Sequence, residues 1–305
     1  MNPNLEVKVG NLVFKNPILL ASGTCGFGRE ISQFYSLEIL GGFITKSITL
    51  KPKQGNPPPR IWETSCGLLN SIGLENPGLE KFLEEEFPFL EKINTHIFIS
   101  IAGETIKEYE ELVKELKNLK ISGIELNVSC PNVDKGGMQF GLDPEVLLEL
   151  TKKVVKIAEK PVWVKLSPQA ENILKMVKMV KKGGGDGVVI FNTFLGLAID
   201  WKNKKPVFKR IFAGLSGPAI KPLVLRYIWE VYEETDLPII GCGGIMEFSD
   251  VMEYILAGAT LVEIGTANFI NPYAGKELIL QLENYFKEEK IQDLIGLAHK
   301  REEEL

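Results

Sequence analysis

The segment GIELNVSCPN, residues 123–132, places a cysteine among amide side chains directly after a short apolar run. Cys130 lies between Asn127 and Asn132, in a loop that continues through two consecutive glycines. A thiol has a reference pKa of about 8.5 and can act as a general base where its surroundings support the thiolate. A glycine-containing loop can deliver such a thiol to a substrate while excluding water. An inert core thiol is the competing interpretation of Cys130, because most free cysteines are of that kind.

The chain offers no histidine for this role. His96 precedes an apolar run and His299 lies in a C-terminal segment expected to be helical, so neither is predicted to approach Cys130. The other cysteines are far apart and have no CxxC spacing: Cys25, Cys66 and Cys242. We expect these to be free, inert core thiols, and the spacing signals neither a metal site nor a disulfide framework.

Two lysines, Lys46 and Lys165, also end apolar runs. A buried lysine is costly unless it meets negative charge, so one interpretation is an ion pair with a core carboxylate such as Glu125 or Glu263. A second interpretation is that the positive charge stabilises a developing anion, such as a reduced flavin, a carboxylate or an enolate. A third is that Lys165 forms a Schiff base, as in an aldolase. The residues alone leave all three open.

The elements that would position these residues form a regular alternation. Short apolar runs typical of buried parallel strands cover residues 16–23, 41–48, 96–103, 123–130, 160–168, 186–193, 237–244 and 260–267. Segments with helical periodicity and start signals cover residues 104–119, 143–160, 171–184 and 248–259. This pattern predicts an α/β fold, a (β/α)8 TIM barrel, in preference to an open doubly wound sheet. We expect one domain over residues 1–305, with a proline-rich loop at residues 51–60 and a polar excursion from the barrel at residues 201–210.

In such a barrel the active site lies at the C-terminal ends of the strands. The residues at these ends are too polar for a core: Ser22, Gly23, Lys46, Ser47, Ser100, Asn127, Lys165, Asn192, Thr193, Gly243, Gly244, Gly265 and Thr266. Because side chains alternate along a strand, we expect two lysines and two asparagines of this set to converge on one space. Gly243, Gly244 and Gly265 would expose N–H groups where barrels commonly hold a phosphate, which predicts an anion site; tight turns are the alternative.

Composition narrows the classes of partner and location. The 305 residues are 45% hydrophobic and carry a formal net charge of -5, without a basic block. Nucleic acid and anionic membranes are therefore not expected partners. The N-terminus lacks a signal-peptide pattern, and we find no apolar run long enough to cross a bilayer, so a cytoplasmic protein is expected.

Taken together, the motifs resemble the dihydroorotate dehydrogenases. They are NPILLASGTCGFG, FITKSITLKP, GLLNSIGLENPG, ELNVSCPNV, VKLSP, FNTFLG, GLSGPAIKPLVLR, IIGCGGI and VEIGTANF, in consistent order from about residue 16 to about residue 271. The resemblance implies an FMN-containing barrel that oxidises dihydroorotate to orotate in pyrimidine (UMP) biosynthesis. It also implies a base that removes a proton from C5 while hydride leaves C6 for the flavin. A cysteine base is similar to the soluble class 1 enzymes; the membrane-associated class 2 enzymes use serine.

The resemblance implies roles for individual residues. Catalytic roles fall to Cys130, Lys46 and Lys165. Substrate binding falls to Lys46, Asn70, Ser71, Ile72, Gly73, Leu74, Asn127, Asn132, Asn192 and Thr193. FMN binding falls to Ser22, Lys46, Ser47, Ser100, Asn127, Lys165, Phe191, Gly217, Gly243, Gly244, Gly265 and Thr266, the last four nearest the phosphate. Amides suit a ring with alternating N–H and C=O groups. Ser100 stands where an asparagine is expected, and Phe191 is bulkier than the usual aliphatic residue.

The segments at residues 214–222 and 21–28 are similar to class 1B. The catalytic chain of that class dimerises and pairs with a second subunit that carries FAD and a 2Fe-2S cluster and reduces NAD+, which implies a heterotetramer. This chain has neither a CxxC framework nor a GxGxxG fingerprint, so NAD+ chemistry would take place on the partner. The alternatives are a fumarate-dependent class 1A homodimer, a related FMN barrel acting on dihydropyrimidines and, more distantly, the Schiff-base aldolase.

Overall fold

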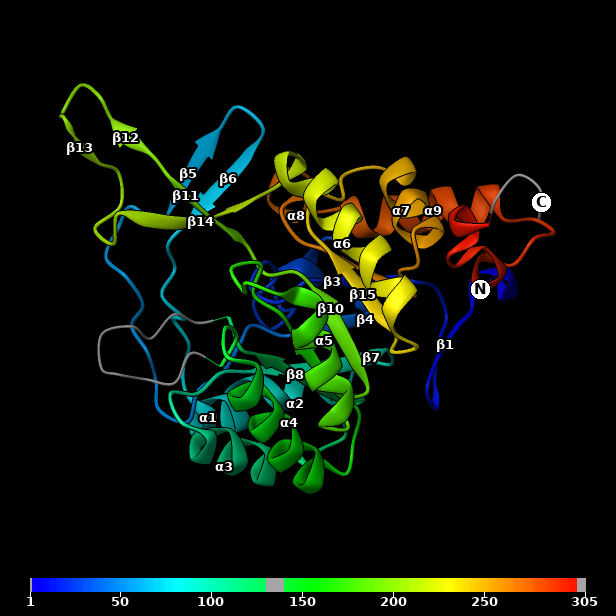
Figure 1. Ribbon diagram of the computed structural model, residues 1–305, viewed down its shortest axis with the longest axis horizontal. Coiled ribbons are helices and arrows are strands. Elements are labelled where there is room, and N and C mark those ends of the chain that lie inside the picture. Colours follow the sequence, from blue (N-terminus) through cyan, green and yellow to red (C-terminus); the bar gives the residue numbers. More distant parts are fainter. Residues whose placement is uncertain (1, 130–139, 301–305) are drawn as a thin grey trace.

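The computed structural model describes residues 2–129 and 140–300 (Figure 1). Eight parallel strands form a closed barrel in chain order, with the last strand paired to the first. They are β3 (Ile18–Leu20), β4 (Gly42–Ile44), β7 (His96–Ile101), β8 (Gly123–Asn127), β9 (Val162–Lys165), β10 (Gly187–Ile190), β15 (Ile239–Cys242) and β16 (Leu261–Ile264). Each lies within one of the predicted apolar runs. The (β/α)8 prediction is confirmed, and the alternative, an open doubly wound sheet, is wrong.

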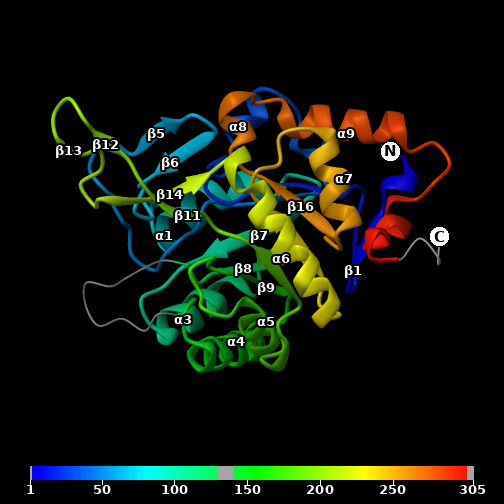
Figure 2. The same ribbon diagram turned by 45° about the horizontal axis from the view of Figure 1, so that its top comes forward.

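Helices surround this barrel (Figure 2). They are α1 (Leu79–Lys81), α2 (Phe87–Leu90), α3 (Ile106–Leu116), α4 (Pro144–Ala158), α5 (Ile173–Lys182), α6 (Lys221–Glu234), α7 (Phe248–Leu256), α8 (Ala267–Ile270) and α9 (Ala274–Tyr285), with a π-helix (Phe82–Glu86) joining α1 to α2. Short 3-10 turns cover Pro3–Leu5, Ile31–Gln33, Leu37–Ile39, Pro218–Ile220, Ile291–Leu294 and Leu297–His299. The predicted helices α3, α4, α5 and α7 are confirmed, whereas α6 and α9 were not predicted. No helix in the described ranges is long and apolar enough to span a bilayer.

A second sheet stands over the carboxyl ends of the barrel strands and projects to one side (Figures 1 and 2). It is antiparallel, in the order β11 (Phe194–Leu197), β14 (Phe212–Ser216), β6 (Gly67–Asn70) and β5 (Ile61–Thr64). A small hairpin of β12 (Ile199–Asp200) and β13 (Lys205–Pro206) extends it. We call these six strands and the segments that join them, residues 61–70 and 194–216, the antiparallel arm. Residues 51–60 contain no helix or named strand, as predicted, and residues 201–210 lie outside the barrel strands and include β13.

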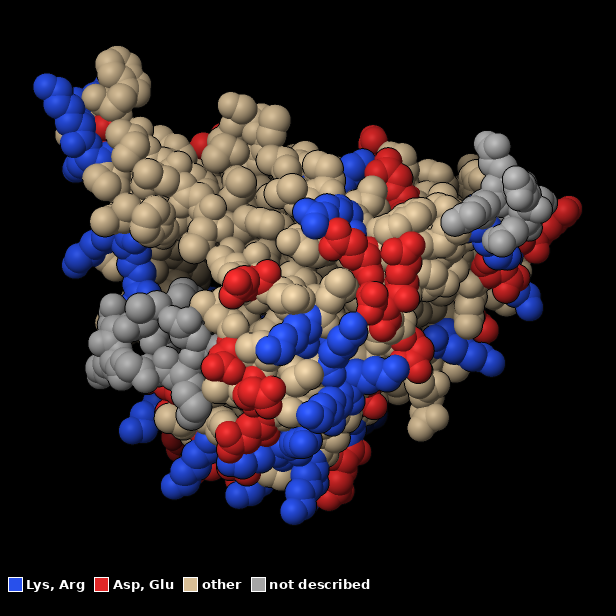
Figure 3. Space-filling model, viewed as in Figure 1, with Lys and Arg blue, Asp and Glu red and all other residues tan. Residues whose placement is uncertain are grey.

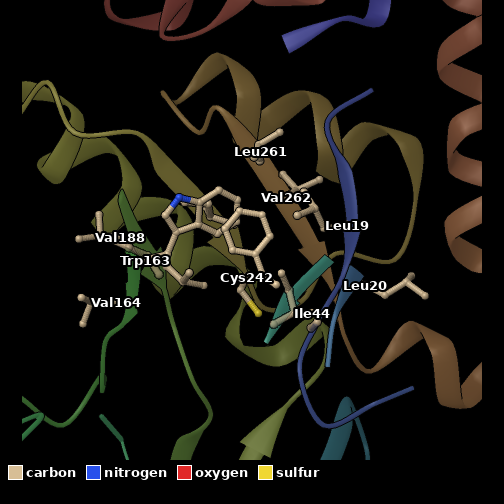
Figure 4. Packing of buried hydrophobic residues seen from close by; sticks show 14 of the residues in the cluster. Leu19, Leu20, Ile44, Trp163, Val164, Val188, Cys242, Leu261 and Val262 are labelled. Carbon is tan, nitrogen blue, oxygen red and sulfur yellow. The ribbon is translucent and has the colours of Figure 1, made fainter. Parts of the chain in front are cut away.

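The barrel interior is filled by large side chains at its amino-terminal end. Trp163 of β9 stacks on Phe98 of β7, with ring centroids 3.8 Å apart and both side chains fully buried. Phe14, from the hairpin of β1 (Val7–Val9) and β2 (Leu12–Phe14), lies 6.0 Å from the Trp163 ring and closes this end. Figure 4 shows Trp163 with other buried side chains of the core, including Cys242 at the carboxyl end of β15. The residues that line the cavity described below lie toward the opposite end of the strands.

Candidate active site

A cavity of about 360 Å³ lies at the carboxyl ends of the barrel strands, between the barrel and the antiparallel arm. Most residues predicted from the strand ends line it: Ser22, Gly23, Lys46, Ser47, Asn127, Lys165, Asn192, Thr193, Gly243, Gly244, Gly265 and Thr266. Phe191, which the resemblance implied, lines it as well. The predicted substrate segment, Asn70, Ser71, Ile72, Gly73 and Leu74, also lines it, where the chain leaves β6. The strand-end prediction therefore identified one real space.

Two predicted cofactor residues do not line the cavity. Ser100 is fully buried, and its hydroxyl lies 2.8 Å from the hydroxyl of Ser47, which does line it. Ser100 therefore supports Ser47 instead of presenting its own side chain. Gly217 packs against Gly67, since a Cβ at position 217 would lie 2.7 Å from the Gly67 Cα. Cys130 and Asn132 lie outside the described residues.

The amides in the cavity hold one another in place. Asn127 donates from Nδ2 to the Ser47 hydroxyl at 3.0 Å, and Asn192 donates from Nδ2 to Asn127 Oδ1 at 3.3 Å. Asn192 Oδ1 in turn accepts from the backbone N–H of Thr193 at 2.8 Å. These contacts fix which end of each amide is the donor and which the acceptor. The cavity thus presents oriented donors and acceptors to a planar polar ligand.

Lys46 lies near the edge of this cavity. Its ammonium nitrogen is 3.2 Å from Glu75 Oε2, and Arg60 Nη1 contacts the same oxygen at 3.3 Å. Lys46 and Arg60 are partly buried and Glu75 is more exposed, so the network is only partly shielded from water. Ion pairs of this kind contribute little stability and can exchange one partner for another. Lys46 is therefore available to an anionic ligand group.

Lys165 is in a different environment, with only 4% of the residue exposed. Its Nζ lies 2.5 Å from Glu263 Oε2 and 3.5 Å from Glu125 Oε2, and both carboxylates are fully buried. Although burial alone would lower the pKa of Lys165, the neighbouring acidic groups raise it well above its usual value, so the amine is charged. The predicted ion pair with a core carboxylate is confirmed. Because Lys165 also lines the cavity, the pairing does not exclude a second role.

Glycines after β15 and β16 form the far end of the cavity. Gly243 and Gly244 have φ values of 134° and 75°, which side chains rarely adopt. Within the described ranges, the backbone N–H groups of Gly243, Gly244, Gly265 and Thr266 donate to no other group of the chain. A Cβ at Gly265 would find no atom closer than 3.7 Å, so this backbone is open to the cavity. Unpaired N–H groups beside open space suit an anion such as a phosphate.

The remaining titratable candidates are elsewhere. His96 Nε2 lies 2.9 Å from the Val13 carbonyl, toward the amino-terminal end of the barrel, and His299 Nε2 lies 3.0 Å from the Ala257 carbonyl. Neither lines the cavity. The three described cysteines are free, and Cys25 and Cys242 are buried as predicted. The prediction for Cys66 is wrong, because it is exposed where β5 turns into β6. Among the described residues no group of three His, Cys, Asp or Glu side chains could hold a metal ion.

Several cavity residues were not predicted. From the arm come Ile61, Leu195, Arg210, Phe212 and Gly214, and from loops come Asn56, Ser129 and Gln169. Gln169 follows the strand-end motif of β9 and donates to the Thr193 carbonyl at 3.4 Å, so its position along the chain is the signal that could have found it. The arm residues gave no such signal, because the arm was not predicted.

On the face seen in Figure 3, charges of both signs alternate over the helices, whereas the tip of the arm carries lysines.

Similarity to known proteins agrees with this geometry. A family model described as dihydroorotate dehydrogenase matches residues 4–286. The chain belongs to the dihydroorotate dehydrogenase family.

Two of its relatives carry the same name, dihydroorotate dehydrogenase B (NAD(+)), catalytic subunit. The one from Thermoanaerobacter pseudethanolicus is 48% identical over 291 residues, which cover 95% of this chain and 96% of the relative. The one from Desulforamulus reducens is 48% identical over 303 residues, which cover 98% and 100%. These names agree with the class 1B resemblance.

The fold is also similar to a crystal structure of DHODH in complex with ferulenol from Eimeria tenella. The TM-score is 0.82, and the match covers 98% of this chain and 90% of the other at 23% sequence identity. At that identity the likeness supports the family's barrel fold and nothing finer.

Proposed function

We propose that this chain oxidises dihydroorotate to orotate with FMN, as the catalytic subunit of an NAD+-linked class 1B enzyme of pyrimidine (UMP) biosynthesis. One observation carries the proposal: two lysines, an oriented amide network and a row of unpaired N–H groups line one cavity, in a chain of this family. The names of the relatives support the NAD+ class.

The residues of the cavity fit FMN. Gly243, Gly244, Gly265 and Thr266 would hold its phosphate through their free N–H groups. Lys165 would lie at the ring, where its charge favours the electron-rich form. When bound, FMN would supply the acceptor for the hydride. Ser22 and Ser47 would contribute hydroxyls, with Ser100 acting beneath Ser47.

The amides and Lys46 would hold the substrate. Asn127 and Asn192 are oriented by their mutual hydrogen bond, so each can match an N–H or C=O group of the pyrimidine ring. Asn70 reaches this space from the arm and donates to the Gly214 carbonyl at 3.1 Å. Lys46 would neutralise the substrate carboxylate, exchanging Glu75 for the ligand.

Cys130 is the proposed base, and its thiolate would take the proton from C5 of the substrate. The assignment rests on the sequence. The described residues on the N-terminal side of Cys130 support it, because Asn127 and Ser129, the latter adjacent to Cys130 in the sequence, line the cavity. Burial excludes the other candidate thiol of the cavity: it raises the pKa of Cys242, which stays a neutral thiol.

Electrons would leave through a partner subunit that carries FAD and a 2Fe-2S cluster, since the sequence shows no motif for either group. We further propose that two copies of this chain form a dimer and bind two such partner subunits, giving a heterotetramer in the cytoplasm. The Schiff-base alternative loses support, because Lys165 is held charged by two carboxylates and a protonated amine is not a nucleophile.

The test is the anaerobic reduction of the yellow protein by dihydroorotate in a stopped-flow spectrometer. We expect Cys130→Ala to keep its flavin absorbance but to reduce it about 10² to 10⁴ times more slowly, the usual contribution of a positioned base. Cys66→Ala is the matched control, because that exposed thiol lies outside the cavity lining, and it should react at the wild-type rate. Unchanged reduction in Cys130→Ala would refute the base assignment, and a protein without affinity for FMN would refute the function. Bleaching by dihydrouracil in place of dihydroorotate would favour the dihydropyrimidine alternative.

A further inference from the structure

Three ionisable side chains meet inside the barrel directly under the cavity. Glu125 comes from β8, Lys165 from β9 and Glu263 from β16, and none is more than 4% exposed. Lys165 Nζ is within 4 Å of both carboxyl groups. Both carboxyl oxygens of Glu125, and Oε1 of Glu263, accept no hydrogen bond from the described part of the chain. We call this set the buried triad.

The charges of the triad do not balance if every group is ionised. Two carboxylates and one ammonium would leave a net negative charge in a fully buried space, where Ser100 and Trp163, the neighbours of Glu125 on the adjoining strands, carry no charge. An uncompensated buried charge costs several kcal/mol, so a carboxyl pair in such a place retains a proton. The nearby Cys242 cannot compensate, because a thiolate would only add negative charge, and burial raises the pKa of Cys242 so that it stays a neutral thiol. One proton therefore has to reside on the carboxyl pair.

Geometry decides which carboxyl group holds it. Glu263 is the closer partner of Lys165, at 2.5 Å with hydrogen-bond geometry, whereas Glu125 is 3.5 Å away. The charged form is favoured where the cation is nearest. In agreement, burial and the neighbouring Glu263 raise the pKa of Glu125 to about 8 against the opposing effect of Lys165.

We propose that Glu125 and Glu263 act as a one-proton carboxyl pair that positions Lys165 and neutralises it beneath the cavity. Glu263 carries the negative charge, Glu125 carries the proton, and the triad as a whole is neutral. If FMN binds as proposed above, on which this step rests, the pair sets how much of the Lys165 charge the flavin ring meets. Glu125 and Glu263 are then positioning residues, because they act through Lys165.

The first test reads the proton itself in the FMN-loaded protein at pH 7. Infrared difference spectra between wild type and Glu125→Gln should show the C=O stretch of one protonated carboxyl group, with a shift in D2O. The same band should vanish in Glu263→Gln, because the remaining carboxyl group then ionises to pair with Lys165. Absence of a protonated carboxyl band from the wild-type minus Glu125→Gln spectrum would overturn the proposal. This readout comes from the polypeptide, so it stands even if dihydroorotate is not the substrate.

The second test is the two-electron reduction potential of the bound FMN, from anaerobic dye titration. Each single variant keeps a neutral triad, so its reduction equilibrium should change by less than about threefold. Glu125→Gln/Glu263→Gln leaves Lys165 unopposed, and the equilibrium should favour reduced flavin by about tenfold or more, which is about 30 mV for two electrons. If both carboxyl groups are ionised in the wild type, each single variant alone would raise the potential and the two effects would add. That additive result would overturn the proposal, and should the double variant not fold, the infrared band decides alone.

Discussion

The antiparallel arm is inserted into the barrel sequence after β4 and after β10, and the exposure of apolar side chains differs between the two regions. Strand β10 is buried along its whole length, because helices cover its outer face and the barrel interior its inner face. Strand β11 begins four residues later, and its side chains alternate between half-buried and exposed. The exposed ones, Leu195 and Leu197, are 60% and 48% accessible to solvent. The arm has only a small core of its own, formed by Leu69, Phe208 and Ala213.

This difference suggests that the barrel determines the stability of the fold and that the arm contributes to ligand binding. The barrel contains nearly all of the packed core and the buried triad. The arm contributes little packing, yet four of its strands, β5, β6, β11 and β14, line the cavity opposite the barrel. A cavity between a rigid body and a lightly packed sheet can adjust one wall without unfolding the other. Changes in the barrel should therefore affect stability first, and changes in the arm should affect ligand binding first.

The largest effect is expected for Trp163→Ala in the barrel. Its ring is fully buried and stacked on Phe98, so removing it should lower the free energy of unfolding by about 3 to 5 kcal/mol. Trp201→Ala in the arm is the matched control: that side chain is 76% exposed, and a change of no more than about 0.5 kcal/mol is expected. Equilibrium unfolding in guanidinium chloride measures both. Similar losses in the two variants would remove the contrast on which the comparison depends.

A smaller effect, counted per pH unit, is expected from the pH dependence of stability. The pKa of Glu125 is about 8 in the folded protein and lies near 4.5 without the fold, so the folded state binds its proton more tightly. The stabilisation that protonated Glu125 contributes is fully present below about pH 4.5 and is lost as the pH rises toward 8. One proton gives a slope of at most about 1.4 kcal/mol per pH unit. Glu125→Gln should therefore gain stability relative to wild type between pH 5 and pH 8 in urea unfolding. A constant difference across this range would show that Glu125 is ionised in the folded protein.

The contrast also explains what could be predicted from the sequence. Barrel strands are unbroken apolar runs that end in glycine or polar residues, a pattern that indicates two-sided burial. Arm strands such as Phe194–Leu197 and Phe212–Ser216 are short and interrupted by glycine, so they are indistinguishable from loops. Helices with a polar N-cap were found, as with Thr105 before α3 and Asp143 before α4. Helix α6 follows Ile220, which offers no side-chain cap, and was missed.

The site shows the same limit. Strand ends identified most of the lining, because the topology of a barrel brings them together. Depth within the barrel was not predictable, so Ser100 was assigned to the cavity although it lies beneath Ser47. Cys66 was assigned to the core because free cysteines usually lie there, and only the β5–β6 hairpin reveals its exposure. The pairing of Lys165 with Glu263 was one of three interpretations, and residue types alone could not rank it.

The smallest change in structure, Gly214→Ala, tests whether the arm positions the ligand. A Cβ at this position of β14 would lie 2.1 Å from Thr193 Oγ1 and 2.8 Å from Thr193 Cβ, so Thr193 must move away from the cavity wall. We expect orotate, titrated by its perturbation of flavin absorbance, to bind about tenfold more weakly, the equivalent of one lost hydrogen bond. Gly196→Ala is the control within the arm, because its Cβ would instead meet the flexible end of Leu69, at 2.8 Å. Equal weakening in both variants would mean that the arm responds as one unit. Weakening in Gly214→Ala alone would assign the effect to the contacts of position 214 with Thr193 and Asn70.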